Sequence, residues 1–208
     1  MPKIVDHAER RKEIASTVLD LIAERGVNAA TIRAVAERSG WSTGVIGHYF
    51  EDRKDLLLGA LRRAGELAGA KQLEINRLLI GRQALEAVLE EELPLDRRRL
   101  ALTRIFVFFY AEAAADESTS AEVDMYLRRW RRQVAHAVRA AQELGDLDPS
   151  LDADIVAMDL VALTDGLSIQ AIFNGELMAR LRESSPIRMW INRLAPLASH
   201  ALDEWITR

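Results

Sequence analysis

The chain has 208 residues, 49% of them hydrophobic and 29% charged, and its net charge of −4 argues against a protein that coats nucleic acid nonspecifically. It contains no cysteine, which excludes disulfides and fits a reducing compartment. The longest apolar run, IFVFFYA at 105–111, is too short to cross a bilayer and no signal peptide is evident, so we expect a cytoplasmic protein without a membrane partner.

Four helices are predicted in the first third of the chain, each with recognisable end signals. The first spans about 7–25, and Gly26 is its expected C-terminal cap. Its apolar positions share one face: Ile14, Val18, Leu21 and Ile22. Thr31 is placed to cap a short second helix and Ser42 to cap a third. A fourth helix is expected at about 52–76.

Long helical segments fill the rest of the chain. The segment 96–115 is apolar on most sides, which predicts a buried central helix, and 117–144 has apolar residues at spacings of three and four. The last two predicted helices, about 151–174 and 186–207, carry wide apolar faces that need a partner surface. No strand alternation appears, and we therefore expect an all-α protein.

The segment 31–50 has the length and turn of a helix-turn-helix. In its second helix, Ile46 and Phe50 are four residues apart and share the face that must pack inward. The residues on the opposite, outward face are Gly44, Gly47 and His48. Because glycine permits close approach of a backbone, we expect this helix to enter a major groove, where Thr43 can bond a base edge and Val45 a thymine methyl.

Residues around this helix are placed for phosphate contacts, which hold a protein in register on DNA. The expected phosphate contacts are Thr31, Arg33, His48, Tyr49, Arg53 and Lys54, and the cap residue Ser42 is expected to belong to the same DNA-binding surface. Residues 1–54 carry nine basic and eight acidic residues, whereas the whole chain carries 28 and 32. Blander readings stay open: many helix-turn-helix shapes never bind DNA, the glycines can be cap residues, Tyr49 can be a packing residue, and Arg53 can be a solvated charge.

A second candidate site lies in the central helices. Their aromatic residues are Phe106, Phe109, Tyr110, Tyr126 and Trp130. The acidic Glu112 and Asp165 lie in largely apolar helices, and an aromatic wall with a carboxylate suits a cationic or amine effector. The alternatives are that the aromatic residues form only the core and that Asp165, beside Gly166, serves dimer packing or a helix bend. The histidines show no metal-binding spacing, and no phosphate loop or nucleophile elbow occurs, so we expect no metal, no cofactor and no enzyme activity.

The first 60 residues resemble the TetR family of bacterial transcriptional regulators. The resemblance is carried by TIRAVAERSGWSTGVIGHYFEDRKDLL at 31–57, which follows a matching first helix. By position it assigns DNA contacts to Thr31, Arg33, Thr43, Gly44, Val45, His48, Tyr49 and Arg53. The chain departs from the family pattern at Gly47, where many members carry a DNA-contacting tyrosine, and at Trp41, which is usually a smaller residue. STGVIGHYF together with ALTDGLSIQAIFNG at 162–175 is most similar to the BetI-type branch.

The resemblance implies a DNA-binding domain at 1–54 and an effector-binding and dimerisation domain at 55–208. It also implies a homodimer whose last helices form a four-helix bundle between subunits. The implied function is that of a ligand-responsive, sequence-specific regulator, a repressor released from a pseudo-palindromic double-stranded DNA operator by a small molecule. The alternative is a helical DNA-binding or protein-interaction module without an effector.

Overall fold

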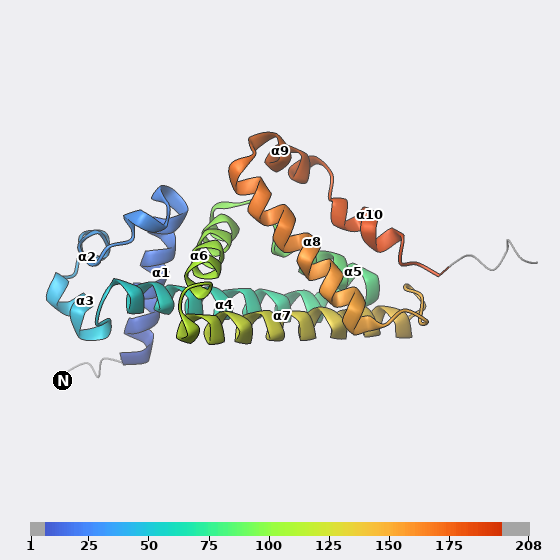
Figure 1. The fold of residues 1–208 in the computed structure, drawn as a ribbon, viewed down its shortest axis with the longest axis horizontal. Coiled ribbons are helices and arrows are strands. Elements are labelled where there is room, and N and C mark those ends of the chain that lie inside the picture. The colour runs from blue at the N-terminus through green and yellow to red at the C-terminus, as the bar shows by residue number, and fades with distance from the viewer. Residues whose placement is uncertain (1–6, 197–208) are drawn as a thin grey trace, which may run out of the picture.

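The computed structural model describes residues 7–196, and this part of the chain is all-helical, as expected (Figure 1). A short 3₁₀ helix spans Val27–Ala29, and the described residues contain no strand. Residues 7–196 form ten α-helices, namely α1 (His7–Arg25), α2 (Ile32–Ser39), α3 (Thr43–Tyr49), α4 (Arg53–Leu78), α5 (Gly81–Glu91), α6 (Arg97–Ala113), α7 (Glu117–Glu143), α8 (Ala153–Phe173), α9 (Gly175–Glu183) and α10 (Pro186–Asn192).

The ends of the first helices follow the local signals in the sequence. Gly26 has a φ of 81° and donates its N–H to the carbonyl of Ile22 at 2.9 Å, so it ends α1 as expected. The hydroxyl of Thr31 accepts from the Ala34 amide at 3.1 Å, and that of Ser42 accepts from the Val45 amide at 3.2 Å. Both predicted N-caps are therefore confirmed.

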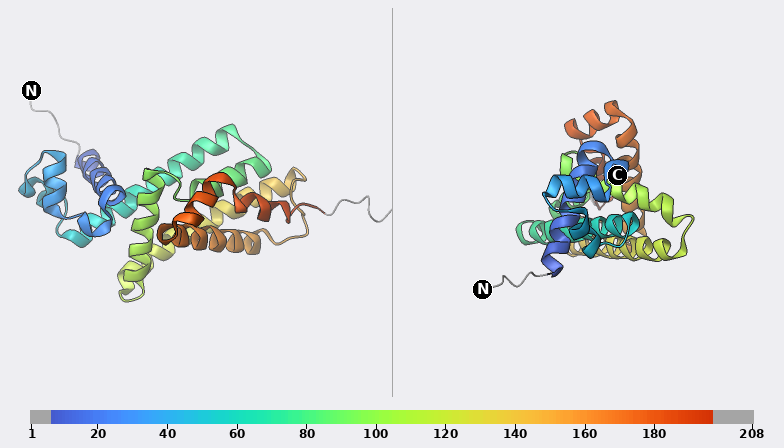
Figure 2. Two further views of the ribbon diagram at one scale, coloured as in Figure 1. Left: turned by 90° about the horizontal axis from the view of Figure 1, so that it is seen from above. Right: turned by 90° about the vertical axis from the view of Figure 1, so that its left-hand side faces the viewer.

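Helices α1–α3 and the start of α4 form a head at one end of an elongated molecule (Figures 1 and 2). The core of the head contains the predicted inward faces of α1 and α3, with Ile14, Val18, Ile22, Ile46 and Phe50 all fully buried. This core does not close at α4, because it continues through Leu61 to Ile105 of α6 and Val123 of α7. The helix-turn-helix is thus packed onto the body through α1, α4 and α6.

The body consists of α4–α10, with α4 running out of the head along the molecule (Figure 1). Tyr126 and Arg129 of α7 lie against α4 at Gly65 and Gly69, where a Cβ would come within 2.4 Å and 3.1 Å of their side chains. Helix α6 packs against α1, α4, α7 and α8. Two of the glycines in α4 therefore serve close helix packing rather than flexibility.

The C-terminal region differs from the expected pair of long helices. The predicted helix 151–174 is α8, but Asn174 then caps a separate helix α9 by accepting from the amides of Glu176 and Leu177 at 3.0 and 3.1 Å. The predicted helix 186–207 ends at Asn192, because the chain turns there before Pro196. Its expected apolar positions beyond residue 196 lie outside the described residues.

Helix α8 is the one helix of the described chain that is long and apolar enough to cross a membrane by length and composition. In the structure it packs against α5, α6, α7 and α9. Ala157, Leu160, Val161 and Thr164 on its inward side are buried. Its outward side carries Ile155, Met158 and Phe173, which are exposed.

Candidate functional site

The outward face of α3 is the first candidate site, and it is open because of two glycines. Gly44 and Gly47 are both exposed and neither has a positive φ. A Cβ added at Gly47 would meet nothing within 4 Å, and one at Gly44 would meet only the Ser42 hydroxyl at 3.7 Å. Neither backbone conformation nor packing in this chain therefore requires glycine at these positions.

The other α3 residues lie as the helical projection predicts. Thr43, Val45 and His48 are exposed, whereas Ile46 is fully buried. Tyr49 is half-buried and forms an aromatic cluster with His48 and His7 of α1, with ring centroids 5.2–5.7 Å apart. The sequence analysis did not predict a role for His7, because it precedes His48 by about forty residues in the chain.

The expected phosphate-binding cations have three different environments. Arg33 is exposed and has no ion pair among the described residues. Arg53 instead donates from Nε to the carbonyl of Ala30 at 3.1 Å and from Nη2 to that of Val27 at 2.9 Å. Lys54 is ion-paired with Asp116. The structure thus leaves Arg33 free for a phosphate, and gives Arg53 and Lys54 partners within the protein.

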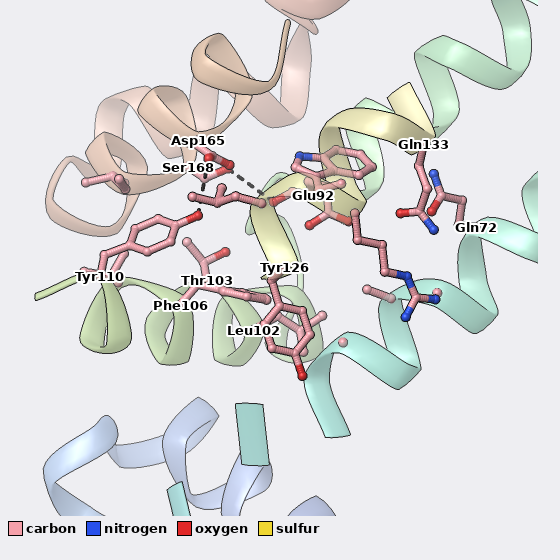
Figure 3. Close-up of a pocket in the computed structure, with 18 residues that line it drawn as sticks. Gln72, Glu92, Leu102, Thr103, Phe106, Tyr110, Tyr126, Gln133, Asp165 and Ser168 are labelled. Carbon is pink, nitrogen blue, oxygen red and sulfur yellow. Dashed lines mark hydrogen bonds between the residues drawn. The ribbon is translucent and has the colours of Figure 1, made fainter. Parts of the chain in front are cut away.

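The second candidate site is a cavity of about 100 Å³ in the body, lined by α4, α6, α7 and α8 (Figure 3). Five of the six expected effector residues line it: Phe106, Tyr110, Tyr126, Trp130 and Asp165. Phe106 packs edge-on against Tyr126 at 5.8 Å between ring centroids. Gly65 makes room for the Tyr126 ring, so the glycine of α4 and the aromatic residue of α7 shape this wall together.

Phe109 does not line the cavity, and the expectation that it contacts an effector is corrected. It is 1% exposed and lies in the core that joins the head to the body. Phe106 and Phe109 lie almost one turn apart on α6, but they face different neighbours. Glu112 is also absent from the cavity, because it is exposed near the end of α6.

Two carboxylates face the cavity. The Tyr110 hydroxyl donates to Asp165 Oδ2 at 3.4 Å, and burial raises the pKa of Asp165 to about 6 although Tyr110 and Arg131 oppose the shift. Glu92, in the turn after α5, also lines the cavity. Burial, and then the proximity of Asp165, raise the pKa of Glu92 to about 7. Two acidic groups beside aromatic rings favour a positively charged occupant.

Comparisons with known proteins agree with this geometry. Residues 14–60 match the family model described as "Bacterial regulatory proteins, tetR family", and residues 81–195 match "BetI-type transcriptional repressor, C-terminal". The chain belongs to the TetR family. It is a BetI-type transcriptional regulator and not an enzyme.

Individual relatives of this TetR-family chain cover most of its length. It is 30% identical to the HTH-type transcriptional regulator PksA of Bacillus subtilis, over 84% of each chain. It is 28% identical to the HTH-type transcriptional regulator BetI of Escherichia coli K12, over 94% of this chain and 99% of the relative. A protein from Saccharomonospora viridis, crystallised in complex with choline, superposes with a TM-score of 0.73 at 28% identity, covering 85% of this chain and 95% of that one.

The sequence analysis missed several polar residues of the cavity in this family member. They are Gln72, Glu92, Thr103, Arg129, Gln133 and Ser168. Glu92 lies in a turn between helices, where an acidic residue ordinarily points to solvent, so no local pattern marked it. Ser168 donates to the Glu92 carbonyl at 3.2 Å and holds this turn against α8. Among the described residues, no group of three His, Cys, Asp or Glu side chains has metal-binding geometry.

Proposed function

We propose that this regulator is a homodimeric repressor that binds a pseudo-palindromic operator and is released by a small cationic effector. The observation that carries the effector assignment is the pair of carboxylates, Asp165 and Glu92, facing an aromatic cavity (Figure 3). The relative crystallised with choline supports the same chemistry, because choline is a quaternary ammonium ion. The division into a DNA-binding part, 1–54, and an effector-binding and dimerisation part, 55–208, belongs to this proposal.

DNA recognition is assigned to the exposed face of α3. With no side chain at Gly44 and Gly47, the helix backbone can approach the floor of the major groove. Thr43 then reaches a base edge and Val45 a thymine methyl. The residues proposed to hold the phosphates are Thr31, Arg33, Ser42, His48 and Tyr49. Arg53 supports this surface from inside by its bonds to the turn before α2.

Dimerisation is assigned to the outward face of α8 together with α10. Ile155, Met158 and Phe173 are 55%, 50% and 77% exposed, and they recur on one side of α8. Met189 and Trp190 of α10 are exposed as well. Apolar side chains in such a row lose contact with water when two copies pack their helices together. Residues 197–207 belong to the predicted interface but lie outside the described part of the chain, so their role stays a prediction.

Helices α4 and α6 each contact both the cavity and the DNA-binding head, and we assign to them the coupling between effector binding and DNA binding. The same helix α4 that lines the cavity at Gln72 begins at Arg53, directly after the helix-turn-helix. Arg104 of α6 donates to the carbonyls of Ile22 and Ala23 at the end of α1. Recognition helices of a dimer must match a groove repeat of about 34 Å, so a shift of a few Å weakens binding. The effector can drive this shift only by its higher affinity for the released state.

The test uses DNA selected from a random pool by the purified full-length protein. Choline is then titrated into the complex while fluorescence anisotropy reports DNA binding. We expect choline to release the wild-type protein from its DNA and to raise its melting temperature. Asp165→Asn should lose both effects and still bind DNA, whereas Glu112→Gln, at an exposed acidic position outside the cavity, should retain them.

Two results separate the alternatives. Specific DNA binding that neither choline nor other quaternary ammonium ions affect would overturn the cationic effector and favour a DNA-binding module without one. A wild-type protein that selects no sequence from the pool would overturn the regulator's proposed reading face on α3.

A further inference from the structure

The two ends of the cavity differ in their polar groups, because one carries a carboxylate and the other carries side-chain amides. Asp165 and the Tyr110 hydroxyl lie together at one end, and Gln72 and Gln133 lie on the side away from them (Figure 3). Arg129 of α7 lines the cavity as well, from the turn before Gln133. A single positive charge on the effector would use the acidic end and leave this guanidinium unused.

Arg129 is placed for a ligand rather than for a protein partner. It is exposed to solvent at the edge of the cavity, and it forms no ion pair or hydrogen bond with any residue between 7 and 196. A Cβ at Gly69 would come within 3.1 Å of its Nη2, so the guanidinium lies against α4 instead of extending outward. The preceding Arg128, in contrast, is ion-paired with Asp124 at 2.7 Å on the surface.

The amides of Gln72 and Gln133 add further unused donors. Neither side chain has a hydrogen-bond partner in the described part of the chain, and both line the cavity. A planar guanidinium with two neighbouring amides presents several N–H groups, and a carboxylate accepts such groups on both of its oxygens. Phe106 and Trp130 add aromatic surface to the same cavity.

We infer that the effector is a zwitterion: a quaternary ammonium or amine at one end and a carboxylate at the other. Asp165 and Glu92 bind the cationic end, and Arg129 binds the carboxylate with the help of Gln72 and Gln133. This inference rests on the proposed function, which assigns a cationic effector to the same cavity. It adds the second charged group and therefore distinguishes the effector from choline, whose other end is a neutral hydroxyl.

The test is isothermal titration calorimetry on the full-length protein with probes that share a trimethylammonium group. The series contains tetramethylammonium, choline, and trimethylammonio carboxylates with one to four methylene groups between nitrogen and carboxyl. We expect at least one carboxylate to bind tenfold or more tightly than choline. The spacer of the tightest probe then measures the separation of the two ends of the cavity.

Variants assign the two ends separately. Arg129→Ala should weaken the tightest carboxylate at least tenfold and leave tetramethylammonium unchanged, and Arg129→Lys should recover part of the loss because it retains the charge but not the planar fork. Asp165→Asn should weaken every probe. Arg128→Ala, the neighbouring surface arginine, is the matched control and should change none.

The possible results test the zwitterionic effector separately from the cationic effector of the proposed function. Carboxylates that bind no better than choline, or that bind Arg129→Ala as well as the wild type, would overturn the zwitterion and leave the cationic effector standing. A wild-type protein that binds no probe, or binding that Asp165→Asn does not weaken, would overturn both.

Discussion

Lys54 on the first turn of α4 is ion-paired with Asp116, the N-cap of α7, with 3.0 Å between Nζ and Oδ2. Asp116 also accepts from the hydroxyls of Thr119 and Ser118. These hydrogen bonds, and then Lys54, hold the pKa of Asp116 well below its usual range. The helix that leaves the helix-turn-helix is thereby attached to the start of α7, which lines the cavity in the body.

This ion pair predicts that Lys54 contributes little to phosphate binding. Each phosphate that a protein neutralises adds about 0.9 to the slope of log affinity against log salt concentration. Because Lys54 is already paired, Lys54→Gln should leave that slope unchanged, whereas Arg33→Ala should reduce it by about 0.9. Anisotropy titrations at several salt concentrations measure both. A reduced slope for Lys54→Gln would show that DNA displaces Asp116.

Arg53 is expected to stabilise the head. Its two hydrogen bonds join α4 to the carbonyls of Val27 and Ala30, more than twenty residues earlier. Since bonds from a charged donor are stronger than neutral ones, Arg53→Ala should lower the free energy of unfolding by about 1–2 kcal/mol. Urea denaturation measures this, with Arg33→Ala as the exposed control that leaves the midpoint unchanged. Equal midpoints for the two variants would assign Arg53 to DNA alone.

The glycines of α3 and α4 should respond differently to substitution. Gly44→Leu meets open space within the chain, and its helix propensity improves by roughly 0.5–1 kcal/mol, so the melting temperature should hold or rise. Operator binding should be lost, because the leucine occupies the space proposed for DNA. Gly59→Ala is the contrast, since its Cβ would lie 2.4 Å from the Phe50 ring, and it should lower the melting temperature. A Gly44→Leu variant that still binds its operator would contradict the assignment of this face.

Effector binding should depend on pH through the two cavity carboxylates. The pKa of Glu92 is raised from 4.5 to about 7 and that of Asp165 from 3.8 to about 6. The folded protein thus binds more protons than the unfolded chain between about pH 4 and 7, so these groups make it less stable as pH rises through that window. Choline is charged at every pH, and its affinity should increase over the same window as the carboxylates ionise.

Calorimetric choline titrations and thermal melting at pH 5 and pH 8 check these trends. The variant Glu92→Gln removes the carboxyl with the higher pKa and keeps Asp165, so the rise in choline affinity should be complete at a lower pH than in the wild type. Choline affinity that falls between pH 5 and 8 in the wild type would contradict the role of the carboxylates.

The proposed dimer should depend on the outward face of α8. Met158→Asp places a charge in the middle of that apolar row and should convert the dimer to a monomer, because an unpaired carboxylate is costly to bury. Leu73→Asp is the control, since Leu73 is 63% exposed on α4. Light scattering coupled to size-exclusion chromatography reports the mass of each variant. A dimeric Met158→Asp protein would place the interface elsewhere.

Local signals made the head predictable from the sequence. The caps Thr31 and Ser42 bond amides three residues away, so a short stretch of sequence contains each complete interaction. The inward pair Ile46 and Phe50 follows from the repeat of the helix alone. The open space beside Gly47 was inferred in the same way, because a helical projection places it opposite the buried pair.

Longer-range partners were decided only by the tertiary structure. Lys54 and Asp116 are 62 residues apart and Tyr110 and Asp165 are 55 apart, and no periodicity connects such positions. The same packing buries Phe109 in the core and places Glu92, a turn residue, in the lining of the cavity. Helical periodicity determines which side of a helix is apolar, but the identity of its neighbour depends on how distant helices cross. The sequence by itself therefore determined the helices and their caps, whereas the folded chain decided which charges are free to meet DNA or an effector.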